Sequence, residues 1–425
     1  MKYRIILLWL AAFFCEQIFA QDINYAKKII DTLCSASMQG RGYVNNGDQK
    51  AAEFIRNEFK NDSLKSFSND YFQSFKISIG TLPGKVAVQI GKNKMTPAVD
   101  YLVSASSATI KGKYKIVRLD SEIVNNEDAF KKFLSTDFSK KFILLDKTGI
   151  KDQKNIDLFN TIERKNLLHA KGIISISSKL VWNVADALIP STGANITIKN
   201  SSLPKQSRKI KVDIEQKFQT DHRMVNVAGY IEGRTKPDSF VVFTAHYDHL
   251  GQMGADVYFP GANDNASGTA MMLDLANYYS ENTPDYSIAF IAFAGEEAGL
   301  LGSEYYVLHP LFPLSNICFL VNLDLVGTGD DGIKVVNGAV IEKEFNLLTG
   351  INDEKKYLKA IEKRGEAAIS DHYPFYTKGV KSFYIYTLGG ISEYHNILDK
   401  AETLPLTKYN ELFRLLIDFV KTLNN

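Results

Sequence analysis

The sequence has few cysteines and no closely spaced pair of them. Its 425 residues include three cysteines, and none has a partner at zinc-finger spacing. Cys318 lies inside the apolar run NICFLVNL. We therefore expect Cys34 and Cys318 to be two separate buried thiols and not a disulfide. A metal in this protein would have to be bound through His, Asp and Glu side chains.

The sequence also lacks a strong charge of either sign. The net charge is +2, with 45% hydrophobic and 23% charged residues, which is ordinary globular composition. Nothing in this balance indicates a nucleic acid or an anionic membrane surface as a partner. The length suits two or three domains, or one large α/β domain that carries an insertion.

The sequence also has no apolar run of membrane-spanning length, and a shorter apolar run stands at its N-terminus. Residues 1–20 have two basic residues, then an apolar stretch over 5–15 and the small residue Ala20, which is the pattern of a secretory signal peptide. The apolar stretch is too short to span a membrane. We therefore expect a soluble mature protein that is secreted or periplasmic. A lipoprotein anchored through Cys15 is the alternative, disfavoured by the two bulky phenylalanines before that cysteine.

The second half of the chain alternates between strand and helix patterns. Its apolar runs SFVVFTAH, YSIAFIAFAG, NICFLVNLD and KSFYIYTLG are typical of strands buried on both faces of a parallel sheet. The prediction is an α/β fold with a mainly parallel or mixed central sheet flanked by helices. Two further helices are expected near the N-terminus, over residues 22–36 and 48–60.

Residues 79–215 differ in character from the rest. Short β-like runs such as KVAVQIG and GIISIS are broken by Lys, Asn, Ser and Gly, with one helix expected at about 156–170. We interpret this segment as an inserted β-rich domain. The expected organisation is a signal peptide at 1–20, a discontinuous catalytic domain at 21–78 and 216–425, and the insert at 79–215.

Polar residues follow the apolar runs of the second half at the points where the predicted strands end. Because ligands of open α/β sheets bind at the carboxyl ends of the strands, we expect these side chains to converge. They are His246, Asp248, Asp264, the adjacent Glu296 and Glu297, Asp324 and His395.

Imidazoles and carboxylates in this number are the ligands of a two-zinc hydrolytic site. Zn²⁺ takes nitrogen and oxygen ligands and keeps one position for water, and a carboxylate such as Asp264 can bridge two ions. Three carboxylates and a bridging hydroxide would balance the charge of two Zn²⁺. Asp248 is placed to accept the other N–H of His246. One of the two adjacent glutamates can bind metal while the other acts as general base.

Sequence motifs of other enzyme classes are either absent or lie in the wrong structural context. The sequence has no G-x-S-x-G nucleophile elbow and no H-E-x-x-H motif. The string GTGDDG at 327–332 fits G-x-G-x-x-G, but the strand-like run IKVV follows it. A dinucleotide site requires a helix at that point.

The strings that surround these residues resemble the co-catalytic zinc exopeptidases of clan MH, which include secreted bacterial aminopeptidases, glutamate carboxypeptidase and glutaminyl cyclases. The stretches NVAGYIEG, AHYDHLG, PGANDNASGTA, AFAGEEAGLLGS, NLDLVG, SDHYPFYTKGV and YHNILD occur in the family's order. With the N-terminal helices, the resemblance covers roughly residues 21–78 and 218–425.

The resemblance implies a role for each of these residues. One zinc would be bound by His246 and Asp324, the other by Glu297 and His395, with Asp264 and a water or hydroxide bridging them. Glu296 would be the general base, and Asp248 would orient a ligand. A cis peptide bond is implied at Asp264–Asn265. Ser370, Asp371 and His372 match a further family motif beside the pocket, without an assigned role.

The insert at 79–215 is similar to protease-associated domains. The strings KFILLDKTG and LLHAKGIISIS carry that resemblance. Aromatic residues at 373–376 are candidate walls of the substrate side-chain pocket.

The function implied is that of a zinc-dependent aminopeptidase that acts on peptides with a free N-terminus. A carboxypeptidase, a glutaminyl cyclase with one zinc, and a non-catalytic binding protein on the same fold are the alternatives. The number of bound zinc ions would separate these classes: two for a peptidase, one for a cyclase and none for a binding protein.

Overall fold

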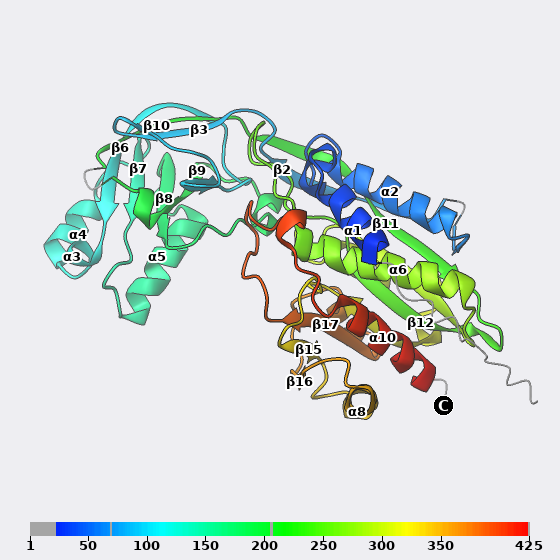
Figure 1. The fold of residues 1–425 in the computed structure, drawn as a ribbon. Coiled ribbons are helices and arrows are strands. Elements are labelled where there is room, and N and C mark those ends of the chain that lie inside the picture. Colours follow the sequence, from blue (N-terminus) through cyan, green and yellow to red (C-terminus); the bar gives the residue numbers. More distant parts are fainter. Residues whose placement is uncertain (1–22, 69, 205–206, 424–425) are drawn as a thin grey trace, which may run out of the picture.

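The computed structural model describes residues 23–68, 70–204 and 207–423, so the expected signal peptide at 1–20 lies outside the described residues. The chain forms two β-sheets with their own helices, and Figure 1 shows the smaller one, in cyan and green, beside the larger. No helix in the described part of the chain has the length and apolar character needed to cross a membrane.

The larger sheet has nine strands, and its four central strands are parallel. Strands at both sides run antiparallel to them. Its order is β1 (Lys65–Ser66), β11 (Lys217–Ile231), β13 (Tyr286–Phe293), β12 (Lys236–His246), β14 (Ile317–Leu323), β17 (Ser382–Leu388), β15 (Gly332–Val336) and β16 (Ile361–Lys363), and β2 (Phe72–Thr81) also pairs with β11.

Helices cover both faces of this sheet, and successive residues of a central strand pack against opposite layers. In β12, Val241 and Phe243 join one core cluster while Phe240 and Val242 join the other, as the two-residue period of a strand requires. The first layer contains α1 (Ile23–Cys34), α2 (Gly47–Asn61), α6 (Gly268–Glu281), α8 (Glu342–Lys355) and α10 (Tyr409–Leu423); the second contains α7 (Leu301–Leu308) and α9 (His372–Thr377). The predicted α/β fold with a mixed, mainly parallel central sheet is confirmed.

The smaller sheet is built from residues 86–214 and is mixed. Its strands β6, β7, β8 and β9 are parallel. Two α-helices connect β6 to β7, and one connects β7 to β8. The elements are β3 (Val86–Ile90), β4 (Asn93–Lys94), β5 (Tyr101–Val103), β6 (Ile110–Leu119), α3 (Ser121–Val124), α4 (Glu127–Leu134), β7 (Lys141–Leu145), α5 (Gln153–Lys165), β8 (Gly172–Ser177), β9 (Ala194–Lys199) and β10 (Lys209–Ile214). The sequence indicated α5 alone among these helices.

The two cysteines of the described chain are unpaired, as expected, but they differ in exposure. Cys34 is buried, whereas Cys318 is exposed. The expected burial of Cys318 is therefore wrong. It is the second residue of β14, and strand alternation turns its side chain away from the side to which the buried Ile317 and Phe319 point.

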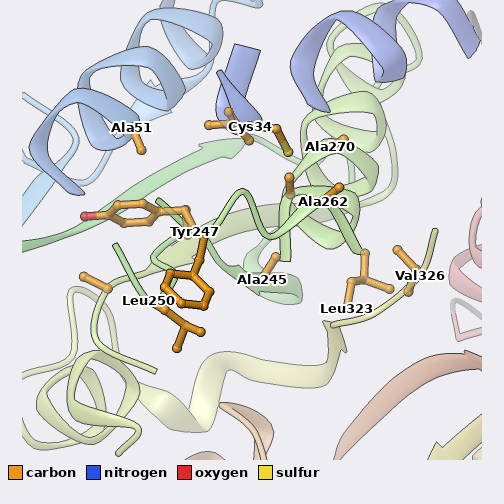
Figure 2. Packing of buried hydrophobic residues seen from close by; sticks show 14 of the residues in the cluster. Cys34, Ala51, Ala245, Tyr247, Leu250, Ala262, Ala270, Leu323 and Val326 are labelled. Carbon is orange, nitrogen blue, oxygen red and sulfur yellow. The ribbon is translucent and has the colours of Figure 1, made fainter. Parts of the chain in front are cut away.

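Small and aromatic residues pack beneath the carboxyl ends of the central strands. Figure 2 shows Ala245 of β12, Tyr247 and Leu250 of the loop that follows it, Ala262 of the turn before α6, and Ala270 of α6. All five are buried. This packing holds the loops that follow β12 in a fixed place above the sheet.

Candidate metal centre

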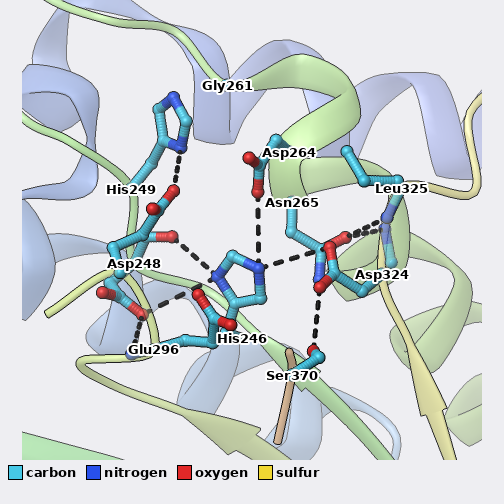
Figure 3. Close-up of polar contacts among 12 residues, drawn as sticks. His246, Asp248, His249, Gly261, Asp264, Asn265, Glu296, Asp324, Leu325 and Ser370 are labelled. Carbon is cyan, nitrogen blue, oxygen red and sulfur yellow. Dashed lines mark hydrogen bonds and ion pairs between the residues drawn. The ribbon is translucent and has the colours of Figure 1, made fainter. Parts of the chain in front are cut away.

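Polar side chains from four strand ends and one helix start meet above the carboxyl edge of the parallel strands. Figure 3 shows His246 with Asp264, Asp324 and Asp248 around its ring. His246 is the last residue of β12, Asp324 follows β14, and Glu296 and Glu297 follow β13. Asp264 lies in the turn Ala262–Ser267 before α6, where its own backbone is not helical, and His395 lies in the loop after β17.

The ring of His246 is fixed by a backbone carbonyl. Its Nδ1 lies 3.1 Å from the carbonyl oxygen of Asp248, which can only accept a hydrogen bond, so Nδ1 carries the proton. Its Nε2 lies 3.4 Å from Asp264 Oδ1 and 3.4 Å from Asp324 Oδ1. In the neutral ring this nitrogen presents a lone pair to two carboxylates, an arrangement that calls for a cation between them.

The same arrangement recurs at His395. Its Nδ1 lies 2.8 Å from the carbonyl oxygen of Trp182, and its Nε2 lies 3.0 Å from Asp264 Oδ2 and 3.1 Å from Glu297 Oε2. The two oxygens of the Asp264 carboxylate therefore face different imidazoles. The five residues predicted to bind metal form one continuous series of contacts: Asp324, His246, Asp264, His395 and Glu297.

The sequence reasoning assigned no role to His249, which is fully buried beside this series. Its Nδ1 lies 2.8 Å from Glu297 Oε1, and it can share a cation with Asp264 and Glu297. His249 lies in the same string AHYDHLG as His246. A second histidine three residues from a candidate ligand could have indicated a further role at the metal centre.

Asp264 is held by its neighbours through the backbone. The carboxylate of Asp399 accepts hydrogen bonds from the N–H groups of Asn263 (2.8 Å) and Asp264 (3.0 Å). The implied cis peptide bond at Asp264–Asn265 is present. Gly261 precedes this turn with φ 60°, and a Cβ there would lie 2.2 Å from the Asp264 carbonyl oxygen, so glycine is required.

Asp324 is oriented by a series of side-chain hydrogen bonds. Thr244 Oγ1 donates to Asn322 Oδ1 (2.7 Å), Asn322 Nδ2 donates to Ser370 Oγ (2.8 Å), and Ser370 Oγ donates to Asp324 Oδ2 (2.9 Å). Ser370, which the sequence left without a role, thus orients a candidate ligand. The next residue, Asp371, accepts a hydrogen bond from Ser303 Oγ (2.5 Å).

Asp248 contacts different groups from those expected. Its carboxylate lies 3.8 Å from His246 Nδ1, too far for a hydrogen bond. Instead it accepts hydrogen bonds from the backbone N–H of Glu296 (3.2 Å) and from Tyr43 Oη (3.1 Å). The chain has left the strand at His246, so the side chain two residues on no longer points to the same side.

The carboxylates and imidazoles of the centre are strongly coupled. Burial disfavours the charge of Asp264, but its contacts with His246 and His395 hold the pKa of its carboxyl well below the usual range. Burial and Asp264 raise the pKa of Glu297, and His395 and His249 outweigh them and bring it to about 2. Burial also opposes the charged form of His395, yet Glu297 and Asp264 raise its pKa to about 11. The carboxylates of the centre are therefore ionised, and the imidazole of His395 beside them is charged.

This geometry fits zinc. Two ligand atoms bound to one tetrahedral zinc at its usual distances lie about 3.3 Å apart, and the nitrogen–oxygen distances here are 3.0–3.4 Å. Within the described chain, Asp324 Oδ1 and His249 Nε2 are buried without a hydrogen-bond partner. Nitrogen and oxygen donors with unused acceptor positions suit a divalent ion.

Two other sequence interpretations have clear outcomes. Residues 332–336 after GTGDDG form strand β15, so the dinucleotide interpretation was rightly rejected. Phe375, within the aromatic group at 373–376, is fully buried and packs on Phe293 and Tyr306. It belongs to the core and does not line a substrate pocket, whereas Tyr373 and Tyr376 are partly exposed, and for them the expectation stays a prediction.

Part of the chain is similar in sequence to known peptidases. Residues 226–420 match the model of peptidase family M28. Aminopeptidase YwaD of Bacillus subtilis (strain 168) is 30% identical over 223 residues, which are 48% of this chain and 46% of that protein. A probable zinc metalloprotease of Leptosphaeria maculans is 38% identical over 114 residues, 26% of each chain. The chain thus spans less than half the length of these curated relatives.

Solved structures are similar over nearly the whole chain. A zinc aminopeptidase from Bacillus subtilis has a TM-score of 0.69 at 20% identity and covers 95% of both chains. An aminopeptidase from Aneurinibacillus sp. strain AM-1 has a TM-score of 0.66 at 18% identity and covers 95% of this chain and 94% of its own. At these identities the similarity establishes the fold.

Proposed function

We propose that this chain, whose residues 226–420 belong to peptidase family M28, is a two-zinc aminopeptidase that removes N-terminal residues from peptides. The resemblance to zinc exopeptidases seen in the sequence is confirmed by that membership. The aminopeptidase activity is inferred from the centre described above, together with the names of the relatives.

One observation carries the proposal: the Asp264 carboxylate lies between two imidazoles whose other nitrogens are both bonded to carbonyl oxygens. With both rings neutral, each lone pair at Nε2 would face two carboxylates. His246 and Asp324 would hold one zinc and His395 and Glu297 the other, and the two oxygens of Asp264 are placed to contribute to both. When bound, two zinc ions supply Lewis acidity for a scissile carbonyl and lower the pKa of a water toward neutrality.

Glu296 is the proposed general base. One of its carboxylate oxygens lies within 4.8 Å of ligand atoms of His246 and Asp324, and its backbone N–H is bonded to Asp248. Burial raises the pKa of its carboxyl well above the usual range, with Asp371 and Glu297 adding to the effect and His246 opposing it. A carboxylate with a raised pKa can take a proton from water and pass it to the leaving amine. Asp248 then acts as the positioning residue for Glu296.

The two remaining parts of the chain have proposed roles as well. We infer that residues 79–215 are an inserted protease-associated-like domain within a catalytic domain formed by 21–78 and 216–425. Residues 1–20 would direct export to the periplasm or medium, and the lipoprotein route through Cys15 is the alternative. N-terminal sequencing of the processed protein tests this: a start at Gln21 supports cleavage of a signal peptide, and a lipidated Cys15 contradicts it.

The experiment for the activity uses a substrate panel. Aminoacyl-anilides, N-blocked peptides and peptides with N-terminal glutamine are incubated with the protein, with and without chelator. We expect chelator-sensitive release from free N-termini alone. Release from the carboxyl end of N-blocked peptides would indicate a carboxypeptidase, and pyroglutamate formation without hydrolysis a glutaminyl cyclase. Either result would overturn the proposal.

A further inference from the structure

The ring of His395 is held by a residue of the smaller sheet's segment of the chain. Trp182 lies between β8 and β9. Its carbonyl oxygen is 2.8 Å from His395 Nδ1, and its backbone N–H donates to the carbonyl oxygen of His395 at 3.0 Å. His246 differs, because the carbonyl that fixes its ring belongs to its own loop, at Asp248.

This double contact fixes both the protonation and the backbone of His395. The carbonyl oxygen requires the proton to stay on Nδ1, which leaves Nε2 free to bind a cation. His395 has φ 50°, a left-handed conformation that is uncommon for residues other than glycine. The hydrogen bond from Trp182 to its carbonyl oxygen supports that conformation.

The Trp182 side chain anchors this contact on both parts of the molecule. The indole is 3% exposed. It stacks on Phe259, in the loop before the Asp264 turn, with ring centroids 4.6 Å apart, and its Nε1 donates to the carbonyl oxygen of Val103 in β5 at 2.8 Å. A displacement of the smaller sheet would therefore move the acceptor of His395 Nδ1.

We propose that Trp182 is a positioning residue for the zinc position formed by His395 and Glu297, so that the segment 79–215 completes one half of the metal centre. The inference rests on the proposed two-zinc function. It adds that one zinc position depends on the inserted segment, whereas the position formed by His246 and Asp324 does not.

The test measures the affinity of each zinc position by competition with a chromophoric chelator, on the full chain. In Trp182→Ala we expect one of the two binding steps to weaken 10- to 100-fold, the range for loss of a residue that orients a metal-bound histidine. The zinc affinity of the other step should stay within about twofold of the wild-type value. The control is Val181→Ala, since that neighbouring side chain is 51% exposed; it should leave both steps unchanged.

Two further variants separate positioning from a loss of structure. Trp182→Phe keeps an aromatic ring against Phe259 and should restore most of the lost affinity. His395→Ala should remove the same step, and the double variant His395→Ala/Trp182→Ala should bind zinc at the remaining step as tightly as His395→Ala does, because both substitutions act on one interaction. Equal weakening of both steps in Trp182→Ala, or no weakening, would overturn the inference.

Tryptophan fluorescence gives a second readout. The sequence has two tryptophans, and Trp9 lies in the proposed signal peptide, so the processed protein carries Trp182 alone. Its emission should change during zinc titration at the step that His395→Ala removes; a change confined to the other step, or no change, contradicts the inference. A wild-type chain with fewer than two zinc sites would overturn the proposed function together with this inference. Two sites that Trp182→Ala leaves intact would overturn the inference alone.

Discussion

Two backbone carbonyl oxygens determine, at the scale of single residues, which nitrogen of each candidate histidine ligand faces the carboxylates. They belong to Asp248 for His246 and to Trp182 for His395. Since a carbonyl cannot donate a hydrogen bond, each ring must keep its proton on Nδ1. When a metal displaces the second proton of each ring, Nε2 is therefore the nitrogen that can bind it.

A buried histidine beside the centre should make stability depend on pH. Burial lowers the pKa of His372 to about 4, below the value of about 6.5 expected in the unfolded chain. Between these values the unfolded state binds more protons, so stability falls as pH drops from about 6.5 to 4, by about 3 kcal/mol in total. Urea unfolding of the zinc-free protein at several pH values should show this contribution as a difference in slope between the wild type and His372→Phe, with the wild type losing more stability as pH falls. Equal slopes would contradict the prediction.

The two described cysteines should differ in reactivity. Burial raises the pKa of the Cys34 thiol to about 12, an effect that the nearby Arg41 only partly offsets, whereas Cys318 is exposed. Because the thiolate is the reactive form, iodoacetamide at pH 8 should modify Cys318 in the folded protein and Cys34 only after unfolding. Peptide mapping by mass spectrometry measures this. Early modification of Cys34 would show that its surroundings open in the folded state.

At the scale of elements, the loops that carry the ligands are held together by one buried arginine. Arg41 follows α1 and is 0% exposed. It donates hydrogen bonds to five backbone carbonyl oxygens in three segments of the chain, which are α1, the loop after β12 and the stretch 260–264: those of Leu33, Tyr247, Pro260, Gly261 and Asp264. It thereby connects the end of β12 to the turn that contains Asp264.

Replacing this arginine should lower the stability of the folded protein. Arg41→Met leaves several buried carbonyl oxygens without donors, and we expect a loss of at least about 3 kcal/mol in the free energy of unfolding. Denaturant unfolding checks the value. The matched control is Arg234→Met, since Arg234 is 65% exposed in a surface ion pair with Asp285, and this change should cost less than about 1 kcal/mol. Similar losses in both variants would contradict the role of Arg41.

The comparison of sequence and structure is also clearest at this scale. The ends of β12, β13 and β14 could be predicted because each apolar run stops at a His, Glu or Asp, and parallel strands present such residues at one edge. The roles of Arg41, Asp399 and Trp182 could not be predicted. They depend on loops that bring distant parts of the chain together, and backbone carbonyl acceptors leave no pattern in a sequence. The predicted contact of the Asp248 side chain with His246 was wrong because it assumed that side chains keep alternating past His246, where β12 ends.

At the scale of the whole molecule, the proposed zinc ions connect three segments that are far apart in sequence: the strand ends of 246–324, the loop at His395 and the segment that carries Trp182. Ions that bind the folded state and not the unfolded state stabilise the fold. Without them, the charge of the Asp264, Glu297 and Asp324 carboxylates is balanced only by neighbouring imidazoles such as His395, whose pKa is raised to about 11.

Metal removal should therefore lower the melting temperature. Each zinc at a free concentration of about 1,000 times its Kd contributes about 4 kcal/mol, so chelation should lower Tm clearly and added zinc should restore it. Scanning calorimetry measures both changes. In Asp264→Asn the zinc-dependent part of Tm should shrink. An unchanged Tm in a protein shown to have lost its zinc would contradict the proposed link between metal and fold.

The central claim is that Glu296 acts as general base beside two zinc ions. The most direct measurement is the kcat of Glu296→Gln on an aminoacyl-anilide, with the zinc content of the same sample determined in parallel. The account predicts a loss of at least about 100-fold in kcat with two zinc ions per chain retained, as in the wild type. Wild-type kcat in a variant that still holds both ions would contradict it.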